Sequence, residues 1–354
     1  MNENLIQKAE LLALDDAQLT ELVLSVGEPR YRAKQLFAQL QSGVAPENMT
    51  NIGKATREKL DKVSYYFLPR IRKKLVSKLD GTVKYLFELI DGNCVESVVM
   101  DYHHGLTICI SSQVGCRMGC KFCASTIGGK VRDLTAGELI GQVIAANVDM
   151  GKRISNIVMM GIGEPLDNYD NVIKFLKLVN HPDGVCIGYR HISLSTCGLA
   201  DKIDKLAREN MQITLSVSLH AADDETRSAI MPVNKKYNTD ALLGACRRYY
   251  ESTGRRISFE YTLIDGKNDS ARDAERLASL LNSKLRTKRD GMPIHVNLIP
   301  VNAVEETGCR PPSREKLNAF SAILERCGIR ATVRRTLGPD INASCGQLRR
   351  AENK

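Results

Sequence analysis

The 354-residue sequence contains no apolar run that approaches the length of a membrane-spanning helix, so we expect no segment to cross a bilayer. The stretch from Met1 to Leu5 lacks the basic flank and apolar core of a secretion signal. No Gly-x-Gly-x-x-Gly fingerprint is present, which disfavours a dinucleotide-binding Rossmann domain, and no low-complexity tract or repeat stands out. These absences predict a cytoplasmic globular protein with no membrane partner.

The composition, with 43% hydrophobic and 26% charged residues, is that of an ordinary globular protein. The length allows one large α/β domain with a small appendage. Because a secretion signal is missing, the 11 cysteines are better interpreted as ligands, reactive thiols and core side chains than as a disulfide framework. The net charge of +9 favours a polyanionic partner, but many enzymes that act on small molecules are equally basic.

The first part of the chain, up to about residue 75, reads as short helices separated by turn signals. We expect these helices over residues 19–26, 31–41 and 56–63. The second helix carries basic residues from Arg30 to Lys34 opposite an apolar stripe. This pattern is typical of a solvated helix face and equally of a small nucleic-acid-binding domain, and the residues alone leave both open.

A β-rich lead-in follows, and from residue 106 onward short β runs alternate with amphipathic helices. This alternation implies a parallel sheet with right-handed crossovers. Six βα units are fewer than the eight of a closed barrel, so the sequence predicts an α/β fold with a partial (βα)6 barrel, open on one side. The lead-in strands are expected at 83–89 and 94–100, the βα units at 106–110 with 135–150, 154–160 with 171–180, 191–196 with 200–209, 213–219 with 239–251, 257–263 with 270–285 and 295–299 with 313–326, and a last strand at 329–333.

Three cysteines with an unusual spacing follow the first strand of the barrel. Cys116, Cys120 and Cys123 form the pattern C-x3-C-x-aromatic-C, which supplies three thiolates from one short loop. Iron–sulfur clusters of the cubane type usually take four, so three leave one iron open, as a catalytic zinc keeps one position free. This is the radical S-adenosylmethionine (SAM) signature, and it predicts a [4Fe–4S] cluster whose open iron chelates SAM. The alternatives are a zinc site closed by His103 or His104, and buried free thiols.

The other unusual motifs fall at the carboxyl ends of expected strands, where parallel α/β barrels collect their working residues. Gly163 would let the backbone approach SAM closely, and the Glu164 carboxylate would accept from its ammonium group. Serine hydroxyls suit ribose or carboxylate, and an asparagine suits an adenine edge. Each motif alone also fits ordinary turn chemistry. The candidate SAM-binding residues are Gly163, Glu164, Ser195, Ser218, Leu219, His220 and Asn302.

Four stretches of the sequence resemble the dual-specificity adenine methyltransferases (RlmN type) of the radical SAM superfamily. They are CISSQVGC at 109–116, MGIGEP at 160–165, SLH at 218–220 and DINASCGQL at 340–348. The resemblance covers nearly the whole chain and implies methylation of C2 of adenine in 23S ribosomal RNA and, in some members, in transfer RNA. The chain departs from the family pattern at Asn342 and Ser344, and it lacks the frequent Pro-rich run after Asn302, but the cysteines are unaffected.

The resemblance also implies roles for three residues outside the cysteine loop. Cys345 would accept a methyl group from one SAM, and a second SAM, cleaved reductively, would generate the radical that takes hydrogen from this S-methyl group. After the carbon radical adds to adenine, Cys109 would form a disulfide with Cys345 and release the methylated base. Glu96 would take the proton of the adenine carbon. From the residues alone, Cys109 is interpreted as a core cysteine and Glu96 as an unremarkable, outward-facing strand carboxylate.

The partners that the resemblance implies are 23S ribosomal RNA, transfer RNA and an external electron donor that is flavodoxin-like or ferredoxin-like, with the chain acting as a monomer. Two alternatives stay open: a sister enzyme that methylates C8 of the same nucleotide, and a non-catalytic zinc-containing RNA-binding protein. The expected domains are a helical RNA-binding accessory domain at 1–75, a β lead-in at 76–101, the radical SAM (βα)6 core at 102–340, and a C-terminal loop at 341–354 that carries Cys345.

Overall fold

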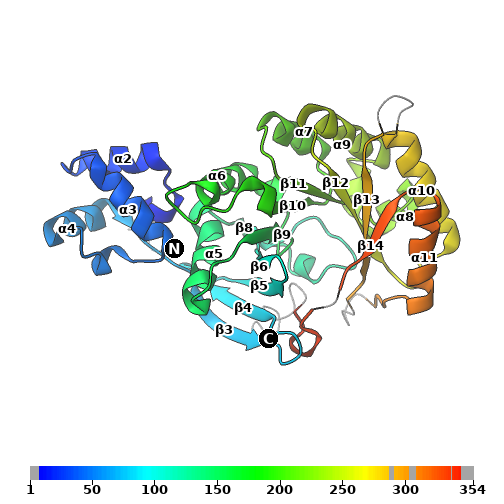
Figure 1. Cartoon of the computed structure of the whole chain (residues 1–354), viewed down its shortest axis with the longest axis horizontal. Helices are drawn as coiled ribbons and strands as arrows, with labels where there is room; N and C mark the ends of the chain where they lie inside the picture. The colour runs from blue at the N-terminus through cyan, green and yellow to red at the C-terminus, as the bar shows by residue number, and fades with distance from the viewer. Residues whose placement is uncertain (1–7, 287–290, 303–307, 336, 344–354) are drawn as a thin grey trace.

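The structure is a computed structural model, which describes residues 8–286, 291–302, 308–335 and 337–343. Its main element is a 10-stranded sheet with the order β14-β13-β12-β11-β10-β9-β6-β5-β4-β3. Strands β6 and β9 to β14 pair in parallel, whereas β3, β4 and β5 pair antiparallel and extend one edge of the sheet. Helices cover the outer face of the parallel part (Figure 1).

The bounds of the elements follow the expected alternation closely. The strands of the large sheet are β3 (Arg70–Val76), β4 (Val83–Glu88), β5 (Cys94–Tyr102), β6 (Gly105–Cys109), β9 (Asn156–Met159), β10 (Ile192–Thr196), β11 (Thr214–Ser218), β12 (Ile257–Leu263), β13 (Ile294–Pro300) and β14 (Arg330–Val333). The helices of the barrel are α5 (Ala136–Met150), α6 (Tyr169–Asn180), α7 (Ala200–Arg208), α8 (Asp224–Ile230), α9 (Thr239–Thr253), α10 (Ala271–Leu285) and α11 (Arg314–Arg326). The predicted partial (βα)6 barrel with an antiparallel lead-in is confirmed.

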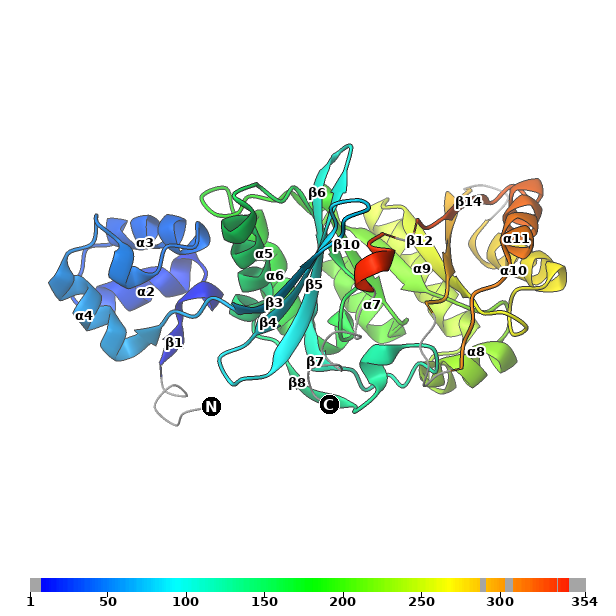
Figure 2. The same cartoon turned by 90° about the horizontal axis from the view of Figure 1, so that it is seen from below.

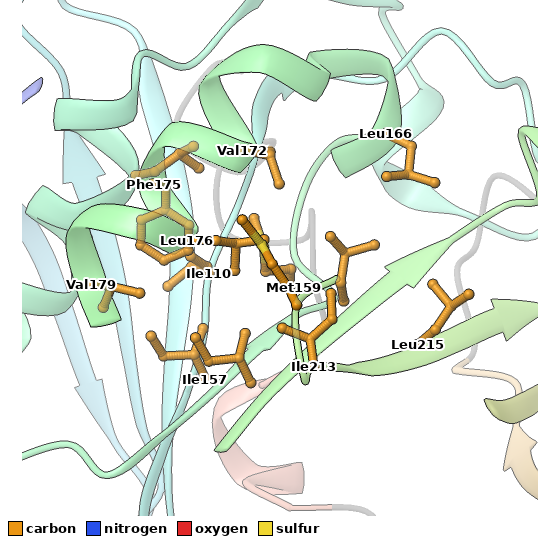
Figure 3. Packing of buried hydrophobic residues seen from close by; sticks show 14 of the residues in the cluster. Ile110, Ile157, Met159, Leu166, Val172, Phe175, Leu176, Val179, Ile213 and Leu215 are labelled. Carbon is orange, nitrogen blue, oxygen red and sulfur yellow. The ribbon is translucent and has the colours of Figure 1, made fainter. Parts of the chain in front are cut away.

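The interior of the barrel forms because its strands are apolar and its helices are amphipathic. All of β12 is buried, as expected of a strand covered on both faces. Figure 3 shows α6 packed on the sheet, where Val172, Phe175 and Leu176 of the helix meet Ile157 and Met159 of β9. Each fully buried side chain of this kind contributes about 1.5–3 kcal/mol relative to exposure.

Several elements of the structure were not expected from the sequence. Strand β3 occupies residues that we assigned to the helical domain, so the β lead-in begins before residue 76. Nearly all its residues are exposed, so it lacks the alternation of apolar side chains that marks a strand. A hairpin of β7 (Gln113–Gly115) and β8 (Lys130–Asp133) encloses the cysteine loop, and the short helix α8 precedes α9. The hairpin strands and α8 are too short to produce a periodic pattern.

The N-terminal lobe contains α2 (Asp16–Ser25), α3 (Tyr31–Gln41) and α4 (Lys54–Val63), with a short parallel pair of β1 (Ala9–Glu10) and β2 (Ser64–Tyr65). The apolar stripe of α3 is buried as predicted, including Leu36 and Phe37. The ring of Phe37 lies 4.7 Å from that of His181, and Lys34 forms an ion pair with Asp183. The lobe, drawn in blue in Figure 1, therefore contacts the barrel just after α6.

No helix within the described ranges is long and apolar enough to span a bilayer.

Candidate active site at the carboxyl edge of the barrel

Two adjoining cavities open where the parallel strands end. The first, of about 200 Å³, is the cysteine-loop cavity. The second, of about 250 Å³, is the Cys109 cavity. The side chains or backbone that line both are Phe122, Cys123, Met160, Thr262, Ile299 and Arg334. The strands end at one edge because they run parallel, so residues from β9 to β13 and from the end of β14 meet there.

All three cysteines of the predicted cluster line the cysteine-loop cavity. The loop leaves β7 at Gly115, which has a φ of +79°, and a Cβ at this position would lie 1.9 Å from the Gly129 carbonyl oxygen, so no side chain fits. The N–H of Cys116 donates to the Gly129 carbonyl at 3.1 Å, and the N–H of Cys123 donates to the Cys120 carbonyl. The hairpin thus closes the loop and presents its thiols to one cavity.

Burial raises the pKa of the Cys116 thiol to about 12 and also raises that of Cys120. A metal that takes thiolates must displace these protons, so loading releases them. Among the described residues, no group of three His, Cys, Asp or Glu side chains converges to hold a metal ion. Three thiols around a void lined by serines and backbone suit a cluster with an open position for a ligand, and the residues fit that group.

Glu164 lies at the wall of this cavity and is buried, and burial raises the pKa of its carboxyl. Its Oε2 accepts from the N–H of Cys197 at 2.7 Å, and its Oε1 accepts from the N–H of Leu166 at 3.0 Å. Gly163 has a φ of +106°, and a side chain there would meet Gln113 at 2.6 Å. The carboxylate therefore joins the end of β10 to the loop after β9 while it faces the cavity.

His220 lines the same cavity with Ser195 and Ser218. Its Nδ1 accepts from the N–H of Thr262 at 2.9 Å, and burial lowers the pKa of its imidazole to about 3, so the ring is neutral. The ring lies edge-to-face with Phe122 of the cysteine loop, at 5.0 Å between centroids. His220 thus supports the loop.

Two of the predicted SAM-binding residues stand apart from this group. Leu219 is fully buried in the core, and its N–H donates to the Glu260 carbonyl at 3.0 Å. Asn302 is exposed and lines the Cys109 cavity. Their roles as SAM contacts stay predictions.

The Cys109 cavity brings together residues that are far apart in sequence. Cys109, at the end of β6, is buried and packs with Val98, Met100 and Ala343. Cys345 lies outside the described residues, but Ala343 is two positions before it. The described end of the C-terminal segment therefore packs against the cluster that contains the predicted resolving cysteine, and it lines the same cavity.

Glu96 is buried on β5, and its Oε2 lies 3.0 Å from Nζ of the buried Lys84. The interpretation of Glu96 as an outward-facing strand carboxylate is therefore wrong. Neither cavity is lined by Glu96, which lies two residues before Val98 on the strand. Its predicted role as proton acceptor is untested.

Two residues of the site, Glu260 and Arg227, were not predicted from the sequence. Glu260, in the middle of β12, lines the cysteine-loop cavity, and burial raises the pKa of its carboxyl. Its Oε2 accepts from Nδ2 of Asn297 at 2.7 Å. A charged residue within an apolar strand was the available signal. Arg227 of α8 is fully buried, and nothing in the polar sequence around it marked it.

Three pairs of adjacent arginines, which are candidates for phosphate contacts, differ in setting: Arg247-Arg248, Arg255-Arg256 and Arg334-Arg335. Arg334 and Arg335 line the Cys109 cavity. Arg247 is paired with Glu251 of its own helix, and Arg248 with Asp204. The cavity pair is therefore the stronger candidate for an anionic substrate.

Comparisons with known proteins agree with this site. The model of the ribosomal RNA large subunit methyltransferase N-terminal domain matches residues 9–65, and that of the radical SAM superfamily matches residues 110–278. The chain is 52% identical to a protein of Alkaliphilus oremlandii over 98% of both chains, and 50% identical to one of Clostridium acetobutylicum over 96% of both. Both are named probable dual-specificity RNA methyltransferase RlmN. The crystal structure of a radical SAM methyltransferase from Sphaerobacter thermophilus matches with a TM-score of 0.89 at 43% identity, covering 96% of this chain and 98% of that one.

Proposed function

The chain belongs to the RlmN family of dual-specificity RNA methyltransferases in the radical SAM superfamily, and on this premise we propose that it methylates C2 of adenine in 23S ribosomal RNA and in transfer RNA. The observation that supports the proposal is the cavity that Cys109, Cys123 and Ala343 line together, because a thiol from outside the cysteine loop and the residue two positions before Cys345 in sequence share it with a cysteine of the loop. The structure leaves C8 methylation as the alternative outcome of the test below.

The residues for the cofactors lie around the cysteine-loop cavity. Cys116, Cys120 and Cys123 would hold a [4Fe–4S] cluster, and the loop after β9 with Ser195 and Ser218 would hold SAM. When bound, these groups supply one-electron chemistry, which a reaction at an unactivated aromatic carbon requires. We infer two SAM molecules per turnover, one for the methyl group and one for the radical.

Two further cysteines, Cys109 and Cys345, divide the methyl transfer between them. Cys345 accepts the methyl group on its sulfur and carries the carbon to the base, and Cys109 attacks Cys345 to release the product as a disulfide forms. The buried position of Cys109 among Val98, Met100 and Ala343 supports this division. A thiol shielded in this way is protected from reagents in bulk water and meets only a group that enters the cavity.

Glu96 serves as the acceptor of the adenine proton. Its buried carboxylate, held by Lys84 at 3.0 Å, lies on the strand that pairs with the Cys109 strand. Carboxylates in general act as bases when they are positioned within hydrogen-bond reach of the proton.

The RNA partners are consistent with the charge of the chain. The net charge of +9 and the exposed cations Arg30 and Lys34 on the N-terminal lobe favour a polyanion. The lobe matches the family's N-terminal domain, and we propose that it binds RNA. The chain acts as a monomer in the cytoplasm, with reducing equivalents from a flavodoxin-like or ferredoxin-like donor.

Mass spectrometry of nucleosides tests the proposal. The reconstituted enzyme is incubated with SAM bearing a deuterated methyl group, a reductant, and ribosomal or transfer RNA that has not been methylated. We expect 2-methyladenosine that carries the label in both RNAs. Labelled 8-methyladenosine would replace the C2 assignment with the C8 alternative, and no labelled adenosine in either RNA would refute the proposal.

A further inference from the structure

The described end of the C-terminal segment is fastened to the β3–β4 hairpin. Oγ of Ser77 donates to Oδ1 of Asp340 at 2.7 Å, and the N–H of Lys78 donates to Oδ2 at 2.9 Å. The N–H of Gly338 donates to Oδ2 of Asp80 at 2.8 Å. Figures 1 and 2 show the short red helix η8 (Pro339–Ile341) beside this hairpin. The segment is therefore held at its start, ahead of Cys345.

One further contact lies deeper. Lys84 of β4 is 0% exposed, and its Nζ donates to the carbonyl of Asn342 at 2.8 Å. The same Nζ lies 3.0 Å from Oε2 of Glu96, whose side chain is 1% exposed. A buried ammonium is costly unless its charge is paired and its protons are donated, so the carboxylate and the carbonyl stabilise this position together.

These contacts place one ammonium between two parts of the proposed chemistry. Asn342 is three residues before Cys345 in sequence, and the adjacent Ala343 packs against the cluster of Val98, Met100 and Cys109. Val98, two residues after Glu96 on β5, is the register partner of Cys109 on β6. Lys84 thus bridges the strand that carries Glu96 and the segment that leads to Cys345.

We propose that Lys84 is a positioning residue that couples the seating of the C-terminal segment beside Cys109 to the carboxylate of Glu96. The roles of Glu96 and Cys345 in this statement rest on the proposed function, whereas the seating itself is a property of the protein alone. Lys84 lines neither cavity, so its effect on catalysis passes through these two neighbours. Loss of Lys84 releases the segment without altering the SAM contacts.

Hydrogen exchange of the full-length protein without RNA tests the seating. The variants are Lys84→Met, the double variant Lys84→Met with Glu96→Gln, Glu96→Gln alone, and Lys78→Met as the control. Lys78 lies on the same hairpin and contacts Asp340 only through its backbone N–H in the hydrogen bond above, which the substitution keeps. The double variant removes both charges, so it folds even where the single variant leaves Glu96 buried and unpaired.

We expect amides of residues 338–343 to exchange at least tenfold faster in both variants that lack Lys84. Exchange in Glu96→Gln should rise between twofold and tenfold, because Lys84 loses its paired charge but keeps its hydrogen bond to the Asn342 carbonyl, whereas exchange in Lys78→Met should stay within twofold of the wild type. Equal protection in the double variant and the wild type would overturn the proposal.

The first methyl transfer supplies a readout that general destabilisation does not move. In single-turnover reactions of the reconstituted enzyme, methylation of Cys345 is followed by mass spectrometry at varied SAM concentration. The double variant should lose at least tenfold in maximal rate with an unchanged half-saturating SAM concentration, whereas the control Lys78→Met keeps both. A change in the half-saturating SAM concentration with an unchanged maximal rate would contradict the proposal. If the proposed function is wrong, the wild type itself will leave Cys345 unmethylated, while the variants still differ in hydrogen exchange. That result would overturn the link between Lys84 and catalysis and would retain only its role in holding residues 338–343.

Discussion

Replacing Arg227 by methionine should destabilise the barrel and weaken SAM binding together. The guanidinium is fully buried and donates to carbonyls at the ends of two strands: Cys197 at 2.8 Å, and Ser218 and Leu219 at 3.2 and 3.1 Å. It also donates to Asn234 Oδ1 at 2.7 Å. Ser218 lines the cysteine-loop cavity with Cys197, so this one side chain fixes two segments of the cofactor site.

The magnitude follows from the hydrogen bonds that the substitution removes. Methionine preserves most of the apolar volume but donates none of these hydrogen bonds, and each buried acceptor left without its donor costs about 1 kcal/mol or more. We expect a total of about 3–5 kcal/mol, which is a large part of the 5–15 kcal/mol that a typical domain has. Lysine, with fewer donors in a different geometry, should lose roughly half of this amount.

Urea unfolding of the protein without its cluster measures the stability. The midpoint should fall by about 1 M or more for Arg227→Met, given urea slopes of about 3 kcal/mol per M for a chain of this size. The SAM affinity of the reconstituted enzyme should fall at least tenfold. Arg208→Met, at an exposed position of α7, is the matched control and should change the midpoint little. An Arg227→Met protein that unfolds at the wild-type midpoint would refute this account of the buried arginine.

Three further outcomes are expected. Replacing all three loop cysteines by alanine should abolish iron and sulfide binding but leave a folded protein; near-stoichiometric iron in that variant would disprove the cluster assignment. Charge reversal of Arg334 and Arg335 should weaken RNA binding. It should also lower the slope of log affinity against log salt by about one for each phosphate that the variant no longer binds. Arg247→Glu, at an arginine already paired with Glu251 on its own helix, should change neither. Asp80 accepts a hydrogen bond from the backbone N–H of Gly338, which lowers the pKa of its carboxyl from an ordinary 3.8 to about 2. The contribution of this carboxylate to stability is therefore complete above about pH 4 and is lost as the pH falls through about 2. Exchange of residues 338–343 should accelerate over that window, and Asp80→Asn should reduce this pH dependence.

The sequence predicted the order of the barrel well because its strands and helices have strong, repeated patterns. Strand β12 was predicted at its observed bounds, since apolar residues alternate with polar ones over a short run. Helix α3 was predicted equally well from its apolar stripe. Strand β3 was missed because a charged edge strand buries almost nothing, and burial is what produces a readable pattern.

The candidate site was predictable only where residue types are specialised. The cysteine loop and the polar ends of strands could be identified from spacing and from the rule for parallel barrels. The support beneath them could not, because it depends on contacts between distant residues. Arg227 reaches the ends of β10 and β11, and Lys84 reaches Asn342 across 258 positions. No local pattern encodes such pairs.

The two-cysteine mechanism is tested most directly by the covalent state of the RNA after reaction with single cysteine variants. The reconstituted Cys109→Ala enzyme, given SAM, reductant and RNA, can still load the methyl carbon on Cys345 but lacks the thiol that releases the base. We predict a protein–RNA adduct that migrates slowly on a denaturing gel and disappears after nuclease treatment. Cys345→Ala and the double variant should form none. Normal turnover by Cys109→Ala, or the same adduct with Cys345→Ala, would contradict the account.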